Sequence, residues 1–228
     1  MKYSNIVSGT FINRPNRFIA EVEIDGKMGI AHVKNTGRCR EILLPGTEIY
    51  LQHVASATRK TQYSLISARK GNLLINIDSQ VPNQVVYDAI VHHEINEFQN
   101  IISVKREVTY NQSRFDLYFE TETEKGFIEV KGVTLEKDSI AMFPDAPTER
   151  GTRHILEMID AVKKGYKGYL FLLIQMKGCH SFKPNAITDP KFAETLKLAS
   201  DNNVQILAYD CNVTEDSIDI SDRIPVVI

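Results

Sequence analysis

The fold of this chain is decided by the stretch Arg114-Phe-Asp-Leu-Tyr-Phe-Glu120, followed after a polar turn by Gly126-Phe-Ile-Glu-Val-Lys-Gly-Val-Thr-Leu135. Two short apolar segments with a turn between them predict a pair of neighbouring strands. Side chains alternate between the faces of a strand, so Glu129 and Lys131 point to the same side. Charged groups in apolar strands are costly to bury without partners, and Asp116 poses the same problem on the first strand.

Asp116, Glu129 and Lys131 form the pattern D…E-x-K, with 129 − 116 = 13 residues between the two carboxylates. This separation suits a hairpin that sets both carboxylates on neighbouring strands. We expect Asp116 and Glu129 to hold Mg²⁺ or Mn²⁺, with the carbonyl of Val130 as a further ligand. Lys131 would orient a water activated by the ion or stabilise the transition state. The pattern predicts a metal-dependent phosphodiesterase site. The structural alternative is a solvated ion pair on an edge strand.

Residues 83–98 predict a helix that precedes these strands, with Asn83 as its cap. Projected at about 100° per residue, Glu94 falls in the middle of the apolar face, four residues from both Ile90 and Phe98. An unpaired carboxylate there is expensive. Glu94 therefore either reaches a partner at the edge of the core or joins the catalytic metal site. Glu97, nearer the rim of the same face, is the competing choice.

The rest of the second half continues with alternating strand and helix patterns. The apolar run at residues 169–176 is typical of a central parallel strand. The order α-β-β-β-α-β, then α-β, predicts a mixed sheet covered by helices. The expected strands are residues 102–110, 114–120, 127–135, 169–176 and 204–209; the expected helices start near residues 147 and 189; and residues 135–142 form a loop.

The first part of the chain reads as short strands and turns without a helix pattern. Asp25-Gly26 is a strong hairpin signal between two of these strands. About five short strands in fewer than 80 residues predict a small β-barrel, most simply an OB-type fold. The expected strands are residues 18–24, 28–33, 48–54, 62–69 and 72–77. Pro82 marks the boundary, so we expect a first domain of residues 1–81 and a second domain of residues 82–228.

A formal net charge of −2 and a pI near 6.3 exclude a global basic surface, so any nucleic-acid binding must use local patches. OB-like barrels bind single strands through basic groups and aromatics. The cations expected to serve this purpose in the barrel are Arg14, Arg17, Arg38, Arg40, Arg59 and Lys60. The alternative is that each of them is ordinary surface charge.

The run Phe143-Pro-Asp-Ala-Pro-Thr-Glu-Arg-Gly151 leads into the helix after the Lys131 strand. Arg150 and His154 share a face of that helix at i, i+4 spacing. Its N-terminal end is therefore expected to lie near the metal site and to offer phosphate contacts. Arg114, close to Asp116, is a further expected nucleic-acid contact. The structural alternative is a helix cap with a local Glu-Arg pair.

Several other classes of protein are excluded. The three cysteines, Cys39, Cys179 and Cys211, are widely spaced without a C-x-x-C pair, which is typical of reduced thiols in a cytoplasmic protein. We find no signal-peptide core and no apolar run of membrane length. The sequence also has no P-loop, no dinucleotide-binding motif and no nucleophile elbow. We therefore expect a soluble cytoplasmic protein without membrane partners.

The turn Asn35-Thr-Gly-Arg38 and the segments around Asp116, Glu129 and Phe143–Gly151, together with His154, resemble the sugar fermentation stimulation protein A (SfsA) family over nearly the whole chain. The resemblance implies an N-terminal OB-like domain followed by a PD-(D/E)xK nuclease-like domain of mixed α/β (α+β) class. It also implies DNA binding and a link to the regulation of maltose and sugar metabolism. Carried over by motif, Asp116, Glu129 and Lys131 are the nuclease-like triad.

These observations lead to an expected Mg²⁺-dependent phosphodiesterase that acts on DNA, with the barrel holding a strand and the second domain cutting it. The rival is a non-catalytic DNA-binding regulator of sugar (maltose) metabolism genes. A third alternative is binding of RNA or nucleotides by the barrel. The sequence leaves open the strand preference, the cut polarity and the oligomeric state, with a homodimer among the alternatives.

Overall fold

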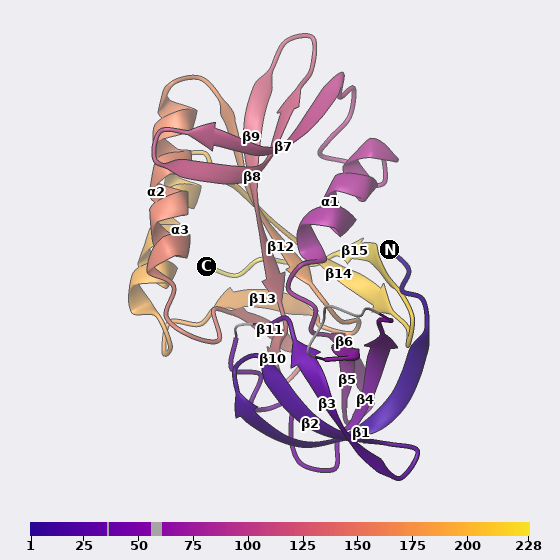
Figure 1. Cartoon of the computed structure of the whole chain (residues 1–228). Helices are drawn as coiled ribbons and strands as arrows, with labels where there is room; N and C mark the ends of the chain where they lie inside the picture. The colour runs from indigo at the N-terminus through magenta and orange to yellow at the C-terminus, as the bar shows by residue number, and fades with distance from the viewer. Residues whose placement is uncertain (36, 56–60) are drawn as a thin grey trace.

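The chain folds into a β-barrel followed by a mixed sheet with helices on both faces (Figure 1). The computed structural model describes residues 1–35, 37–55 and 61–228. Arg59 and Lys60, two of the expected barrel cations, and Thr36 of the turn at residues 35–38 lie outside the described residues. The fold class expected from the sequence, an OB-like barrel before a nuclease-like α/β part, is confirmed.

The barrel consists of a six-stranded sheet in the order β3-β2-β1-β4-β5-β6, which closes through a parallel pairing of β3 with β5. Asp25 and Gly26 both take positive φ at the expected hairpin turn. The first strand was not expected, because among its eleven residues only Phe11 is fully buried and no alternation is visible. The strands are β1 (Ile6–Asn16), β2 (Ile19–Ile24), β3 (Lys27–Val33), β4 (Glu48–His53), β5 (Tyr63–Lys70) and β6 (Leu73–Asn76).

The second part is built on a six-stranded sheet in the order β15-β14-β12-β9-β8-β7. The strands β9, β12 and β14 are parallel, and the remaining pairings are antiparallel. The expected order of elements is confirmed, and β15 adds an edge. The elements are α1 (Pro82–Val91), β7 (Ser103–Tyr110), β8 (Ser113–Glu120), β9 (Lys125–Val133), α2 (Glu149–Lys163), β12 (Lys167–Ile174), α3 (Pro190–Asp201), β14 (Gln205–Val213) and β15 (Ile218–Arg223).

Helices cover both faces of this sheet, as Figure 1 shows with α1 on one side and α2 and α3 on the other. Val86 and Ile90 of α1 belong to a core cluster with Phe171 of β12. Ile155 of α2 and Leu196 of α3 belong to the other cluster, which continues into the barrel. Burial of each such side chain stabilises the fold by about 1.5–3 kcal/mol. Ile66 of β5 belongs to the first cluster as well, so both cores include residues of the barrel and of the sheet.

The helix α1 ends earlier than expected. It stops at Val91 because His93 adopts a left-handed φ of 60° and the backbone N–H of Glu94 donates to Ala89 O at 2.8 Å. This is the Schellman pattern of a helix end. The expected helix over residues 83–98 is therefore wrong in its second half. Phe98 is still buried, but a turn rather than a helix brings it into the core.

The segment expected as a loop at residues 135–142 is also different. It forms a hairpin of β10 (Leu135–Lys137) and β11 (Ile140–Phe143), which turns at Asp138 and Ser139 with positive φ. β11 then pairs in parallel with β13 (Ser181–Pro184). Strands of three or four residues are too short to display an alternation in the sequence.

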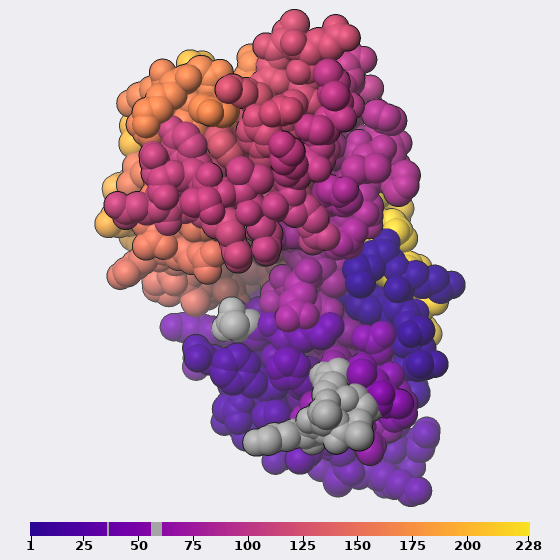
Figure 2. Space-filling model, turned by 45° about the horizontal axis from the view of Figure 1, so that its top comes forward, coloured from indigo at the N-terminus to yellow at the C-terminus, as the bar shows by residue number. Residues whose placement is uncertain are grey.

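Two further contacts attach the barrel to the second part. Lys2 forms a bridge to Ser217, and the N–H of Tyr3 donates to Asp216 O at 2.7 Å. Figure 2 shows this first segment of the chain lying against residues near the other end of the chain. Across the interface, Lys70 of β5 forms an ion pair with Glu136 of β10. Among the described helices, none is long and apolar enough to span a membrane.

Candidate active site

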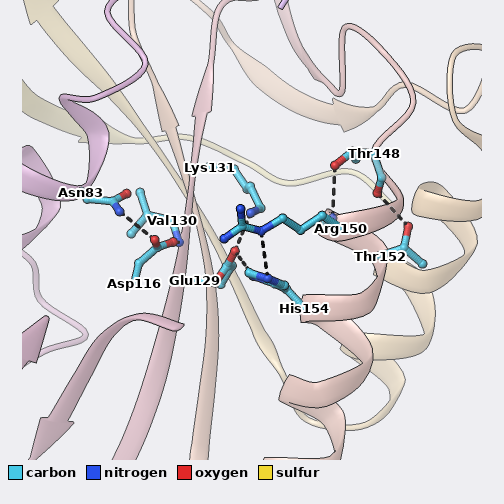
Figure 3. Close-up of polar contacts among 10 residues, drawn as sticks. Asn83, Asp116, Glu129, Val130, Lys131, Thr148, Arg150, Thr152 and His154 are labelled. Carbon is cyan, nitrogen blue, oxygen red and sulfur yellow. Dashed lines mark hydrogen bonds and ion pairs between the residues drawn. The ribbon is translucent and has the colours of Figure 1, made fainter. Parts of the chain in front are cut away.

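Asp116 on β8 is held at both of its carboxylate oxygens (Figure 3). Its Oδ2 accepts the backbone N–H of Val130 at 2.8 Å, and its Oδ1 accepts from the side chain of Asn83 at 2.7 Å. Asn83 lies in the first turn of α1, so the helix and the hairpin together fix one orientation of the carboxylate. The sequence indicated only a helix cap for Asn83. Val81 is the N-cap instead, and Asn83 reaches the site.

Glu129 on β9 is buried, with 2% of its surface exposed. Its Oε1 accepts from Lys131 Nζ and lies 2.6 Å from His154 Nδ1. Its Oε2 is buried and has no hydrogen-bond partner among the residues that the structure describes. A buried carboxylate oxygen without a donor is expensive, because it has lost its hydration. This atom is therefore available to a cation or a proton donor.

The neighbours of the two carboxylates shift their pKa values in opposite directions. Burial raises the pKa of Asp116, and the charge of Glu129 raises it further. Burial by itself also raises the pKa of Glu129, but Lys131 and His154 outweigh it and hold that pKa below its usual range. Lys131 therefore supplies a positive charge that favours the ionised form of Glu129. The structure brings together Asp116, Glu129 and Lys131, as the D…E-x-K pattern predicts.

His154 has a different place from the one expected. It is buried, and its Nδ1 faces Glu129, so a direct contact with nucleic acid does not fit. Arg150 Nε donates to His154 Nε2 at 3.3 Å, which requires that Nε2 is unprotonated. Nδ1 then carries the proton and donates to Glu129. His154 is placed to position Glu129, and its sequence signals were the i, i+4 spacing to Arg150 and its part in the family resemblance.

The start of α2 brings these two residues to the sheet. Thr148 is the N-cap, and its Oγ1 accepts the N–H of Gly151 at 3.1 Å. The N–H of Thr148 itself donates to Asp189 Oδ2 at 2.8 Å. Arg150 is exposed, and Figure 3 shows its side chain extending from α2 toward β9.

Neither expected upstream acid lies at this site. Glu94 is exposed on the turn after α1, because the helix ends before it. Glu97 accepts from Tyr209 Oη at 2.6 Å and from Arg223 Nη1 at 2.8 Å. The assignment of Glu94 or Glu97 to the catalytic metal site is therefore wrong in geometry. The side chain of α1 that contacts Asp116 is the neutral Asn83.

The residues present fit a divalent cation that brings most of its ligands as water. Within the described ranges, no group of three or more His, Cys, Asp and Glu could hold a metal. Mg²⁺ needs no such cage, since it is usually bound through one or two carboxylates plus water and phosphate oxygens. Asp116 and Glu129, with the unpartnered Oε2, supply two carboxylates of this kind.

The arginines outside α2 that were expected to contact nucleic acid have exposed side chains. Arg17, Arg38 and Arg40 lie at the surface of the barrel. Arg114 is exposed on β8, 3.4 Å from Glu107. Arg14, in contrast, is committed to the fold, because its guanidinium donates to four backbone oxygens of residues 17, 35, 37 and 38. It organises the turn at residues 35–38 and is not free surface charge.

Comparisons with known proteins agree with this architecture. A family model described as "Sugar fermentation stimulation protein RE domain" matches residues 80–217, and one described as "SfsA N-terminal OB domain" matches residues 12–77. An OB domain followed by a restriction-endonuclease-like domain implies nucleic-acid binding.

Related chains match over their full length. The chain is 54% identical over 231 residues to the sugar fermentation stimulation protein homolog of Alkaliphilus oremlandii, covering 99% of this chain and 98% of that protein. It is also 54% identical over 226 residues to the homolog of Desulfitobacterium hafniense (strain DSM 10664 / DCB-2), with the same two shares.

A solved structure is also similar over the whole chain. The structure of Pyrococcus furiosus SfsA in complex with Ca²⁺ matches with a TM-score of 0.91 and 30% identity, covering 100% of this chain and 98% of that one. The OB barrel, the restriction-endonuclease-like sheet and these full-length matches lead to one conclusion. The chain belongs to the sugar fermentation stimulation protein (SfsA) family.

Proposed function

We propose that this protein is a metal-dependent phosphodiesterase that cleaves DNA. The observation that carries the proposal is the buried Glu129, whose Oε2 has no partner while Lys131 lies against its other oxygen. A purely structural ion pair gains nothing from a buried carboxylate oxygen without a partner, whereas a cation site uses such an oxygen as a ligand. The second carboxylate, Asp116, is close enough for the charge of Glu129 to raise its pKa.

The residues would divide the work as follows. Asp116, Glu129 and the carbonyl of Val130 would hold Mg²⁺ or Mn²⁺. When bound, the ion supplies a lowered pKa for its water and neutralises charge on the phosphate. Lys131, with only 17% of its side chain exposed, donates to the attacking water or to a phosphate oxygen. His154 keeps Glu129 in one orientation.

Two findings on relatives support the choice of ion and chemistry. The Pyrococcus furiosus relative is described as a complex with Ca²⁺, which, like Mg²⁺, prefers oxygen ligands. The family model over residues 80–217 carries the description RE domain. We place the domain boundary between Val81 and Pro82, so that the barrel, with its exposed arginines, holds the strand and the second domain cuts it.

The test is cleavage of labelled single-stranded, duplex and branched DNA with Mg²⁺ or Mn²⁺. We expect the wild-type protein to cut at least one of these substrates. Lys131→Ala and Asp116→Asn should lose cutting by at least about a hundredfold and keep DNA binding, since they remove groups needed in the transition state. Lys137→Ala, at an exposed lysine on β10, is the matched control and should cut like the wild type.

The rival is a non-catalytic DNA-binding regulator. It is favoured by one observation, that Glu129 Oε1 is already engaged by Lys131 and His154. DNA binding without cutting on any substrate, unaffected by Lys131→Ala and Asp116→Asn, would leave this rival as the better description.

A further inference from the structure

A cavity of about 410 Å³ lies between the barrel and the second part, directly beside the candidate active site. Gly132, the residue after Lys131, lines it from β9, and Thr148 lines it from the start of α2. Asn35 and Gly37 line it from the barrel. The volume lies in the range of about 300–1,000 Å³ that small-molecule sites have.

Gln175 places a buried acceptor in this cavity. The residue is 1% exposed, and its Nε2 donates to Asn76 Oδ1 at 3.0 Å and to Asp78 O at 3.2 Å. The N–H of Asp78 also donates to Asn76 Oδ1, which fixes that atom as an oxygen and so fixes the Gln175 amide. Gln175 Oε1 has no donor among the described residues. A Cβ added to Gly132 would lie 2.3 Å from it, so the oxygen faces the cavity wall at Gly132.

Asn35 adds a donor. It is 8% exposed, and its Oδ1 accepts the N–H of Gly37 at 2.7 Å. This bond fixes the amide, and Nδ2 has no acceptor within the part of the chain that the structure describes. The cavity thus contains one amide oxygen and one amide N–H₂, both on side chains that are more than nine-tenths buried.

The rest of the lining selects the class of ligand. Met142, Phe143 and Pro144 supply apolar surface, and the two charged lining residues, Arg17 and Asp145, are of opposite sign. A ligand that suits these walls is flat and apolar on its faces, with donors and acceptors at its edge.

We infer that the cavity binds one nucleobase of the DNA strand, unstacked from its neighbours, with its edge at Gln175 Oε1 and Asn35 Nδ2. This inference rests on the proposed function, because it places the base next to the phosphate held at Lys131. A base presents both a donor and an acceptor on its edge, so the pair of amide groups fits a base edge. Unstacking a base costs least in a single strand.

The test is equilibrium binding of a fluorescein-labelled single-stranded DNA oligonucleotide, with Ca²⁺ in place of Mg²⁺. A series of strands lacks the base at one position at a time. We expect wild-type protein to bind about tenfold more weakly when one particular base is missing, which is the scale of one base contact, and to tolerate the other positions. Asn35→Asp keeps the oxygen that accepts the N–H of Gly37, and it replaces the amide N–H₂ that faces the cavity with a carboxylate oxygen. It should bind the intact strand about tenfold more weakly and lose the dependence on that position.

Two more variants complete the design. Asn72→Asp makes the same charge change in the exposed β5–β6 turn and should keep the wild-type profile. Ala146→Leu narrows the cavity from its wall without a change of charge and should lose the sensitive position. Circular dichroism and thermal melts verify that each variant is folded.

A wild-type profile without a sensitive position, or one unchanged in both Asn35→Asp and Ala146→Leu, overturns the inference. Cutting with Mg²⁺ together with a flat profile removes only the base site and leaves the phosphodiesterase. A sensitive position without cutting on any substrate keeps the base site and removes the phosphodiesterase.

Discussion

Glu129 shows how a single residue can carry opposing demands. Its burial favours the neutral acid, yet Lys131 and His154 keep it ionised. Only one of its two oxygens is used by these partners, because both donors meet Oε1. The other oxygen has no hydrogen-bond partner among the described residues, and in our proposal it is the one that binds the metal ion.

His154→Gln is predicted to weaken Mn²⁺ binding about 10- to 100-fold, the usual effect of removing a group that orients a metal ligand. The reason is that Glu129 loses the imidazole that, beside Lys131, holds its Oε1. Isothermal titration with Mn²⁺ measures this. The matched control is His92→Ala, at an exposed histidine after α1, which should leave Mn²⁺ binding unchanged. Equal Mn²⁺ affinity in wild type and His154→Gln would contradict a positioning role.

At the residue scale, the sequence could predict Asp116, Glu129 and Lys131, since charged side chains in apolar strands need a reason. It could not predict that His154 faces inward. The spacing to Arg150 places both residues on one helical face but does not say what that face meets. Glu94 was misplaced because its assignment depended on a helix that the positive φ of His93 ends.

Asp189 connects two helices. Its Oδ1 accepts the N–H of Phe192 and caps α3, and its Oδ2 accepts the N–H of Thr148 where α2 starts. One carboxylate therefore fixes the relative position of both N-termini. Because α2 carries Arg150 and His154, this contact supports the candidate site from a distance.

Asp189→Ala is predicted to lower the free energy of unfolding by about 2 kcal/mol. The reason is that it removes one helix cap and one further hydrogen bond to a charged group. Urea denaturation followed by circular dichroism measures the change. Asp201→Ala, at the exposed C-terminal end of the same helix, is the control and should cost little. A loss no larger for Asp189→Ala than for Asp201→Ala would show that the two helices do not depend on this contact.

At the element scale, the long elements were predictable and the short ones were not. The apolar run of β12 and the amphipathic α2 have patterns that only one kind of element satisfies. The hairpin of β10 and β11 has too few residues for such a pattern. β1 is long, but most of its side chains are only partly buried, so its sequence lacks alternation.

At the scale of the whole molecule, the barrel and the second part are joined by an ion pair. Glu136 Oε2 lies 2.6 Å from Lys70 Nζ, and Glu136 Oε1 accepts the N–H of Ser139. Burial by itself raises the pKa of Glu136, but these two donors outweigh it, and the pKa is lowered below its ordinary value of 4.5. The contribution to stability is therefore present above about pH 4.5 and is lost as the pH falls through the lower pKa of the folded state.

Glu136→Gln is predicted to destabilise the protein by about 2 kcal/mol at pH 7, because Lys70 loses a charged partner. The difference from the wild type should shrink as the pH is lowered below 4.5, the ordinary value. Thermal melts at several pH values measure both effects. Glu122→Gln, at an exposed carboxylate that forms no ion pair among the described residues, should show neither the destabilisation nor its pH dependence. A difference that is the same at every pH would exclude the ion pair as its cause.

The arrangement of the two parts is what the sequence could least predict. Strand and helix patterns indicate a barrel and a sheet, but not that Gln175 and Asn76 meet between them at 3.0 Å. The cavity beside Lys131 depends on this docking, so none of its polar groups stood out from the sequence. Contacts between distant segments follow from shape and packing, which a pattern along the chain does not record.

The pairing of Lys2 with Ser217 has a mechanical consequence. It fastens the barrel to the second part beside β15, and the covalent chain joins the same two parts again between β6 and α1. The ion pair of Lys70 with Glu136, the hydrogen bond of Gln175 with Asn76 and the shared core add further attachments. We therefore expect the two parts to unfold together in one transition, because neither can separate without breaking contacts at several distant points.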